Sequence, residues 1–128
     1  MIEVLNRHKK RIGFIEENKF FNEKKKLLGS IEKGIVKNEK GRVLIRIDKH
    51  DGIFFENEQV GFILESTIYY REKPIYEFSK EKGEIHTSDG NKSLILKGEI
   101  ENLEDGDFFG IASVYLESQW WERVTGKK

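Results

Sequence analysis

The chain has 128 residues, and its 23 Lys/Arg balance its 23 Asp/Glu. This length fits one domain, residues 1–128, that can bury a core without disulfides or a structural metal. The chain has no cysteine, which excludes a disulfide framework, a thiolate zinc site and a cysteine nucleophile. No run reaches the roughly 18 apolar residues of a membrane span, and the N-terminus lacks a signal-peptide pattern. We therefore expect a cytoplasmic protein without a membrane partner.

The balanced total conceals an uneven distribution of charge. Residues 1–50 carry 14 Lys/Arg and 7 Asp/Glu, a net +7, whereas residues 51–128 carry 9 and 16, a net −7. If the two halves occupy different sides of the fold, the molecule is a dipole, which favours self-association or an oriented partner. The alternative is a set of solvated charges without a role in binding.

The N-terminal half of the chain repeats with a 16-residue step. Three positions recur in phase, and repeats of this size mark small units that bury their apolar face by stacking on their neighbours. The positions are an aliphatic register (Ile12, Leu28, Leu44, Val60), a glycine register (Gly13, Gly29, Gly61) and an isoleucine register (Ile15, Ile31, Ile47, Ile63). In the third unit Ile45 takes the place of the glycine.

Each unit has the pattern of a strand, a tight turn and a second strand. In the third unit Asn38 lies where a turn favours a side chain that bonds its own backbone, and Gly41 lies where φ becomes positive. Short turns at 17–18, 33–34 and 51–52 join the units. The pattern therefore predicts a continuous antiparallel meander.

One position in the repeat breaks the alternation of a strand. Val43, Ile45 and Ile47 share one face, so Leu44 belongs to the other, yet its position is aliphatic in all four units. Either both faces are covered there or the strand bends, and the neighbouring glycines favour a bend. Bent strands curl a sheet into a closed barrel or a rosette.

The repeat continues less regularly to residue 98. A fourth hairpin covers 53–63, a fifth covers 67–78 with its turn at 72–74, and a sixth covers 84–96 with its turn at Asp89-Gly90. Pro74, the single proline, is expected where no backbone donor is needed. The predicted fold class is mainly β: an antiparallel hairpin-repeat meander over 4–98, barrel- or rosette-like, plus one C-terminal helix.

That helix is predicted over 107–124. Asp107 is a suitable N-cap, Gly126 a suitable terminator, and an apolar stripe runs through Phe109, Ala112 and Leu116 to Trp120. The helix would plug or cover the open end of the sheet. A final strand over 112–116 is the alternative, because short apolar runs fit both structures.

A family resemblance rests on the repeated aliphatic-Gly-x-Ile segments at 12–16, 28–32 and 60–63. Over about residues 4–98 this pattern resembles the four-fold β-flower proteins, a bacterial group. The resemblance implies a compact, pseudo-symmetric arrangement of hairpins and no particular activity. The fifth and sixth hairpins depart from the pattern, with Tyr76 and Leu94 in place of the glycine.

Motifs for catalysis are absent from the sequence. His8, His50 and His86 fall at or near turns without metal-ligand spacing, and neither a nucleophile elbow nor a phosphate loop occurs. We therefore predict no metal site, no cofactor and no enzymatic activity. We predict instead a non-catalytic protein-interaction module able to self-associate, with a small-molecule or carbohydrate binder that uses exposed aromatic residues as one alternative.

Two surfaces are candidates for binding. The first would be an interface anchor of Trp120, Trp121, Tyr69 and Tyr70, or alternatively these residues close the core. The second is a basic edge that would contact nucleic-acid phosphates, although Glu23 and Glu39 interrupt it and no aromatic residue lies among the lysines. The basic edge comprises Arg7, Lys9, Lys10, Arg11, Lys24, Lys25, Lys26, Lys40 and Arg42.

Overall fold

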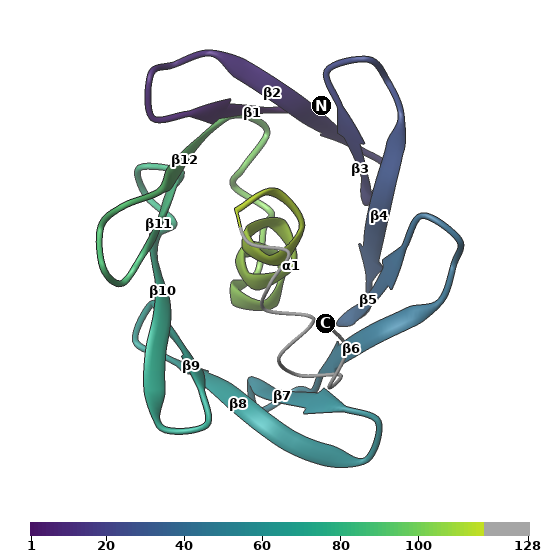
Figure 1. Ribbon diagram of the computed structural model, residues 1–128, viewed down its shortest axis with the longest axis vertical. Helices are drawn as coiled ribbons and strands as arrows, with labels where there is room; N and C mark the ends of the chain where they lie inside the picture. The colour runs from purple at the N-terminus through teal and green to yellow at the C-terminus, as the bar shows by residue number, and fades with distance from the viewer. Residues whose placement is uncertain (117–128) are drawn as a thin grey trace.

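Six β-hairpins form a closed ring around a central helix (Figure 1). The structure is a computed structural model that describes residues 1–116. Within this range each strand pairs antiparallel with the next, and β1 pairs with β12, which confirms the predicted closed meander. The hairpins are β1 (Ile2–Asn6) with β2 (Arg11–Glu16), β3 (Lys19–Asn22) with β4 (Leu27–Glu32), β5 (Ile35–Asn38) with β6 (Val43–Ile47), β7 (Gly52–Phe55) with β8 (Glu58–Leu64), β9 (Thr67–Tyr70) with β10 (Lys73–Ser79), and β11 (Glu84–Thr87) with β12 (Ser93–Gly98).

The tips of the first three hairpins share one hydrogen-bonding scheme. The Oδ1 atoms of Asn6, Asn22 and Asn38 each accept two backbone N–H groups of the following turn, at 2.9–3.0 Å. An asparagine side chain stabilises a turn in this way by replacing a backbone acceptor. The scheme predicted for Asn38 therefore recurs with the 16-residue step, and the tips project outward around the ring (Figure 1).

A β-bulge lies at the aliphatic position of each of the first five hairpins. In the first, Val4 pairs with Gly13 and Leu5 with Arg11, so Ile12 is the extra residue. The bend predicted from this position is thus present, and it explains why an aliphatic residue recurs there: the bulge turns these side chains toward the core. The corresponding extra residues are Leu28, Leu44, Val60 and Ile75.

Three glycines next to the bulges allow neighbouring hairpins to approach closely. A Cβ atom added to Gly13, Gly29 or Gly61 would overlap a backbone carbonyl oxygen of the next hairpin. Those oxygens belong to Phe21, Lys37 and Tyr69 respectively. Since only glycine lacks a Cβ, the glycine register permits the hairpin-to-hairpin contact.

The helix α1 (Asp105–Tyr115) lies inside the ring and fills it (Figure 1). Phe108, Phe109, Ile111 and Ala112 are completely buried, so the helix is covered on all sides. A barrel of eight strands can be filled by its own side chains, and a wider one needs additional filling. The predicted plug is therefore confirmed, in the form of an internal helix. Within the described residues, no helix is long and apolar enough to cross a membrane.

Both ends of α1 are fixed by hydrogen bonds. The N-cap is Glu104, not Asp107 as predicted; Asp107 is the third helical residue, and its carboxylate accepts the Glu104 backbone N–H at 2.9 Å. This capping box starts the helix two residues earlier than expected. At the other end the Tyr115 hydroxyl lies 2.7 Å from the Phe21 carbonyl oxygen and 3.1 Å from that of Phe14. Burial raises the pKa of Tyr115, so the phenol stays a donor. The predicted helix end at 124, and Gly126, lie outside the described residues.

The turn of the fifth hairpin differs from its prediction. The turn is Arg71-Glu72, whereas Lys73 and Pro74 belong to β10. Pro74 pairs with Tyr69 directly beside the bulge at Ile75. Because a bulge interrupts the regular ladder, it accommodates a residue that lacks an N–H group.

The glycine register yields a prediction about stability. Gly61→Ala should lower the free energy of unfolding by roughly 1–3 kcal/mol, because the methyl group would overlap a backbone oxygen that belongs to the neighbouring strand. Gly41→Lys should change stability by less than about 1 kcal/mol. Gly41 has open space around it, and Lys9 and Lys25 adopt the same positive φ at the equivalent tip positions.

Urea denaturation of the two variants checks this prediction. Equal losses in both would contradict the greater cost expected where a glycine permits close approach between hairpins.

Candidate functional site

The outer wall of the ring is the surface that remains for binding. The interior is occupied by α1 and by the apolar side chains that every hairpin directs inward. Among residues 1–116, no group of three or more His, Asp or Glu side chains is arranged to hold a metal ion. His8 and His50 lie exposed in turns, and His86 lies in β11 with Nδ1 3.1 Å from the Thr87 carbonyl oxygen. The candidate binding surfaces therefore lie on the outside of the ring.

Charge is divided between two sides of the ring. Residues 1–50, which contain β1 to β6, carry a net +7, whereas residues 51–98, which contain β7 to β12, carry 6 Lys/Arg against 9 Asp/Glu, a net −3. Figure 1 shows that β1 to β6 and β7 to β12 occupy opposite parts of the ring, with α1 at its centre. The two oppositely charged halves of the chain thus lie on different sides of the fold, which is the arrangement required for a molecular dipole. We call the two parts the basic side and the acidic side.

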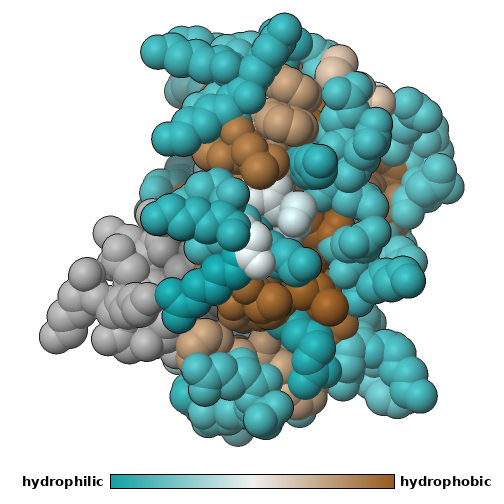
Figure 2. All heavy atoms as spheres, turned by 90° about the vertical axis from the view of Figure 1, so that its right-hand side faces the viewer, coloured by the Kyte–Doolittle hydropathy of each residue, from teal (hydrophilic) through white to brown (hydrophobic). Residues whose placement is uncertain are grey.

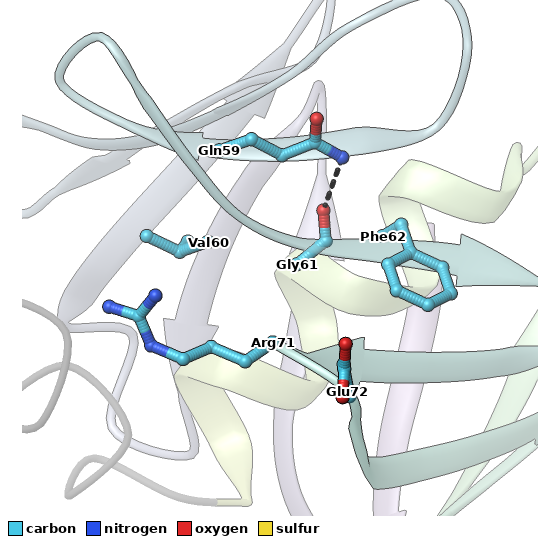
Figure 3. Close-up of a pocket in the computed structure, with 6 residues that line it drawn as sticks. All are labelled: Gln59, Val60, Gly61, Phe62, Arg71 and Glu72. Carbon is cyan, nitrogen blue, oxygen red and sulfur yellow. Dashed lines mark hydrogen bonds between the residues drawn. The ribbon is translucent and has the colours of Figure 1, made fainter.

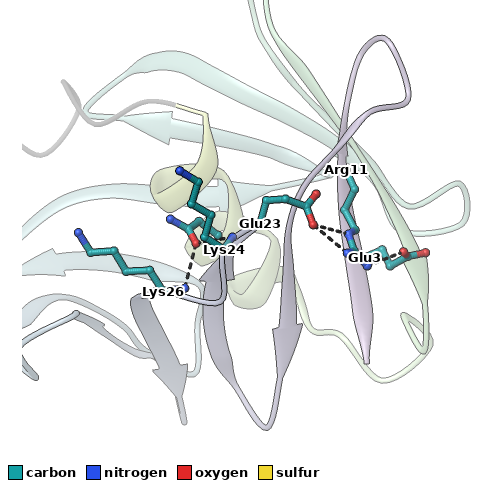
Figure 4. Close-up of polar contacts among 6 residues, drawn as sticks. Glu3, Arg11, Glu23, Lys24 and Lys26 are labelled. Carbon is teal, nitrogen blue, oxygen red and sulfur yellow. Dashed lines mark hydrogen bonds and ion pairs between the residues drawn. The ribbon is translucent and has the colours of Figure 1, made fainter.

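The predicted basic edge is only partly available to a ligand. Arg11 binds Glu23 of the next hairpin through Nε at 2.9 Å and Nη2 at 2.8 Å, and its Nη1 lies 3.3 Å from Glu3 (Figure 4). Arg7 donates to the Asn91 carbonyl oxygen at the sixth hairpin tip, at 3.1 Å. These two arginines join adjacent hairpins. Within the described part of the chain the other members make no ion pair: Lys9, Lys10, Lys24, Lys25, Lys26, Lys40 and Arg42.

Aromatic side chains cover the outer wall where two pairs of hairpins meet. Phe14 stacks on Phe21 with ring centroids 5.0 Å apart, and Phe62 stacks on Tyr69 at 4.6 Å. The pair Phe14–Phe21 lies where the first two hairpins meet, so the structure places an aromatic pair on the strands that adjoin the first two basic tips. The signal was present in the sequence, because Phe14 and Phe62 occupy the outward position that follows each register glycine.

The structure places the two tyrosines of the predicted aromatic anchor on different faces of the sheet. Tyr69 faces outward, but Tyr70, the next residue of the strand, packs against the core, with the Arg71 guanidinium 5.4 Å from its ring centre. Adjacent residues in a strand point to opposite faces, so the two tyrosines do not form one surface. Trp120 and Trp121 lie outside the described residues, and their role as an anchor stays a prediction.

An apolar groove separates the third hairpin from the fourth. Its volume is about 420 Å³, and Val43 at its edge is 53% exposed. Figure 2 shows the right-hand side of the ring in Figure 1, with apolar patches between hydrophilic residues. Arg46 stacks over Phe54 at 4.7 Å. The lining residues are Ile35, Arg42, Val43, Leu44, Ile45, Arg46, Phe54, Phe55 and Glu56.

The groove lies where the repeat is broken. Ile45 fills the slot that holds glycine in β2, β4 and β8, and a backbone oxygen cannot approach it as closely. The ladder from β6 to β7 contains two residue pairs, Arg46 with Phe54 and Ile47 with Ile53, whereas β4 with β5 and β8 with β9 contain four. The connecting turn at 48–51 is also longer than those at 33–34 and 65–66. The ends of β6 and β7 that lie nearer the hairpin tips are therefore unpaired with each other.

A second hollow, between the fourth and fifth hairpins, is more open and more polar than the groove. Figure 3 shows the residues that line it. Gln59 donates its side-chain amide to the Gly61 carbonyl oxygen at 3.1 Å. Arg71 lies across it, with Nη1 3.8 Å from Glu58. The Arg71 guanidinium at this hollow therefore already has a carboxylate nearby.

Carboxylates gather around the N-terminus of α1, on the rim opposite the hairpin tips. Burial, and then the nearby Asp105, Asp48 and Glu104, raise the pKa of Asp51. Burial likewise raises the pKa of Asp107. In contrast, hydrogen bonds from the backbone of Gly52 and His50 lower the pKa of Asp48. The folded state therefore disfavours the ionised forms of Asp51 and Asp107 and favours the ionised form of Asp48.

Comparison with protein-family models, curated proteins and solved structures finds no match to this chain. The resemblance to the four-fold β-flower proteins accordingly stays a prediction.

The opposite pKa shifts of Asp51 and Asp48 predict opposite pH dependence. The folded state disfavours ionised Asp51, so Asp51→Asn should raise the free energy of unfolding at pH 7 by less than about 1 kcal/mol, given its partial exposure. This gain should disappear as the pH falls through the raised pKa. Asparagine also tolerates the positive φ of 64° at this position.

Asp48→Asn is the matched control. The folded state favours ionised Asp48, so the substitution should destabilise at neutral pH, and the difference should fade as acid protonates Asp48 in the parent protein. Urea denaturation at several pH values measures whether each substitution raises or lowers the free energy of unfolding. The same sign in both variants would contradict the electrostatic account of the rim.

Proposed function

We propose that this protein is a non-catalytic protein-interaction module that binds an acidic protein surface through the basic side of its ring. The observation that carries the proposal is the separation of charge between the two sides, together with the apolar groove on the basic side. Apolar contact supplies affinity at such a surface, and complementary charge orients the partner and speeds association. The filled interior favours binding on the outer wall over binding inside the ring.

Affinity capture from a lysate of the source organism tests this function, with nuclease treatment and with two salt concentrations as separate arms. We expect a partner protein to be retained after nuclease treatment. It should be released in about 0.5 M salt, where the screening length falls to about 4 Å.

A pair of charge variants makes the test specific. Reversal of Lys24, Lys25 and Lys26 to glutamate lowers the net charge of residues 1–50 from +7 to +1 and should weaken capture at least about tenfold. The control reverses Lys73, Lys82 and Lys92, which are exposed outside the basic side, and changes the total charge equally. Equal loss in both variants, or no protein retained by the parent chain, would contradict the proposed function.

Single-stranded nucleic acid is a second candidate ligand, supported by one observation. The stacked pair of Phe14 and Phe21 lies between two tips that carry unpaired lysines, and aromatic rings with flanking cations bind unpaired bases and their phosphates. Titration of a labelled single-stranded oligonucleotide at several salt concentrations distinguishes it. If this ligand is bound, the logarithm of its binding constant should fall with the logarithm of the salt concentration. Reversal of the three lysines should make this slope shallower by about one for each phosphate that the lysines neutralise.

A further inference from the structure

The strongest unassigned surface is the groove between the third and fourth hairpins, and a second copy of this chain carries a feature that fits it. Three large apolar side chains among the described residues are more than half exposed: Met1, Val43 and Leu64. Val43 lies at the edge of the groove on the basic side. Leu64 lies at the end of β8, followed by exposed Glu65 on the acidic side. One copy thus presents an apolar recess and the other an apolar projection.

The turn that carries Leu64 is rigid before binding. Leu64 pairs with Thr67, and the two residues between them, Glu65 and Ser66, have φ of 49° and 67°. Both values are those of a type I′ turn, the tight connection that matches the twist of its strands. A projection held in this way loses little conformational entropy when it is bound.

The charges around the two features are complementary. Arg42 and Arg46 line the groove, and within residues 1–116 neither has an ion-pair partner. Glu56 also lines it, so these three residues leave a net positive charge. Glu65 is adjacent to Leu64 and has no ion pair in the same part of the chain. The surrounding charges favour the same contact, since the groove belongs mainly to the side with net +7 and the turn to the side with net −3.

We infer that the protein self-associates head to tail, with the Leu64–Glu65 turn of one copy seated in the groove beside Val43 of the next. Leu64 contacts the apolar floor, and Glu65 pairs with Arg42 or Arg46. Because the two surfaces differ, the contact is heterologous and generates open chains or closed rings instead of symmetric dimers. This inference rests on the proposed function, for which it names one partner and one contact.

Sedimentation velocity over a range from micromolar to millimolar protein tests the inference. The parent chain should form assemblies whose mass grows with concentration and declines toward the monomer in about 0.5 M salt. Val43→Glu places a like charge opposite Glu65, and Leu64→Ser removes the projection. Each variant alone should remain monomeric, with an association constant at least about tenfold lower.

Mixing the two variants is the decisive arm. The Leu64→Ser chain keeps an intact groove and the Val43→Glu chain an intact turn, so the mixture should form a one-to-one dimer and nothing larger. A charge exchange adds a second readout: Arg46→Glu should weaken assembly, and Glu65→Arg added to the same chain should restore part of it. Lys92→Glu, at an exposed position outside both surfaces, is the control with an equal change in charge.

The outcomes separate this inference from the proposed function. A parent chain that stays monomeric, assemblies that neither Val43→Glu nor Leu64→Ser affects, or a mixture without dimers would overturn head-to-tail assembly through the groove. Capture of a different acidic protein by the basic side would still support the proposed function in each of these cases. Circular dichroism of each variant confirms that any loss of assembly occurs in a folded protein.

Discussion

The structure depends on the fit between one apolar helix and the ring that surrounds it. Twelve strands enclose more space than their inward side chains can fill, and α1, which is apolar on all sides, would be insoluble when exposed. The helix therefore fills the interior of the ring, and the ring shields the apolar helix from water. The capping box at Glu104 fixes the start of the helix, and the Tyr115 hydroxyl ties its other end to the first two hairpins through the Phe14 and Phe21 carbonyl oxygens. Because the interior is used for stability, binding is left to the outside.

The repeat made most of this architecture predictable. An aliphatic residue on the wrong face of a strand, next to a glycine, indicated a bend, and a bulge lies at that position in five hairpins. The helix boundary was predicted less well, because Asp107 is a good N-cap in isolation and only the tertiary structure shows that it serves Glu104 from within the first turn. The turn at Arg71-Glu72 was displaced in the prediction because Pro74 favours a turn locally but is accommodated beside a bulge.

The candidate surfaces were less predictable than the fold, and the reason is physical. Sequence places a residue on the outer wall, but it does not show which residue of a neighbouring hairpin lies opposite. The pairing of Arg11 with Glu23, twelve positions away, removes that arginine from the basic edge. The stacking of Phe14 on Phe21 places an aromatic pair between two basic tips. Both contacts arise from strand register, and a repeat of 16 residues specifies which hairpins are neighbours more readily than it specifies which side chains meet.

Positions that the repeat keeps constant and positions at which it varies have different roles. Asparagine at the tips, the glycine register and the inward isoleucines recur because turn geometry, close approach and core packing impose the same requirement on each hairpin. No such requirement acts on the outward position after the glycine slot, which holds Phe14, Ser30, Arg46 and Phe62. Ile45 differs from both groups, because it replaces the glycine at a position that is otherwise constant in these hairpins. The adjacent strands β6 and β7 share two residue pairs. A repeat protein acquires a specific surface where its symmetry is broken, and in the first four hairpins the break at Ile45 coincides with the apolar groove between the third and the fourth.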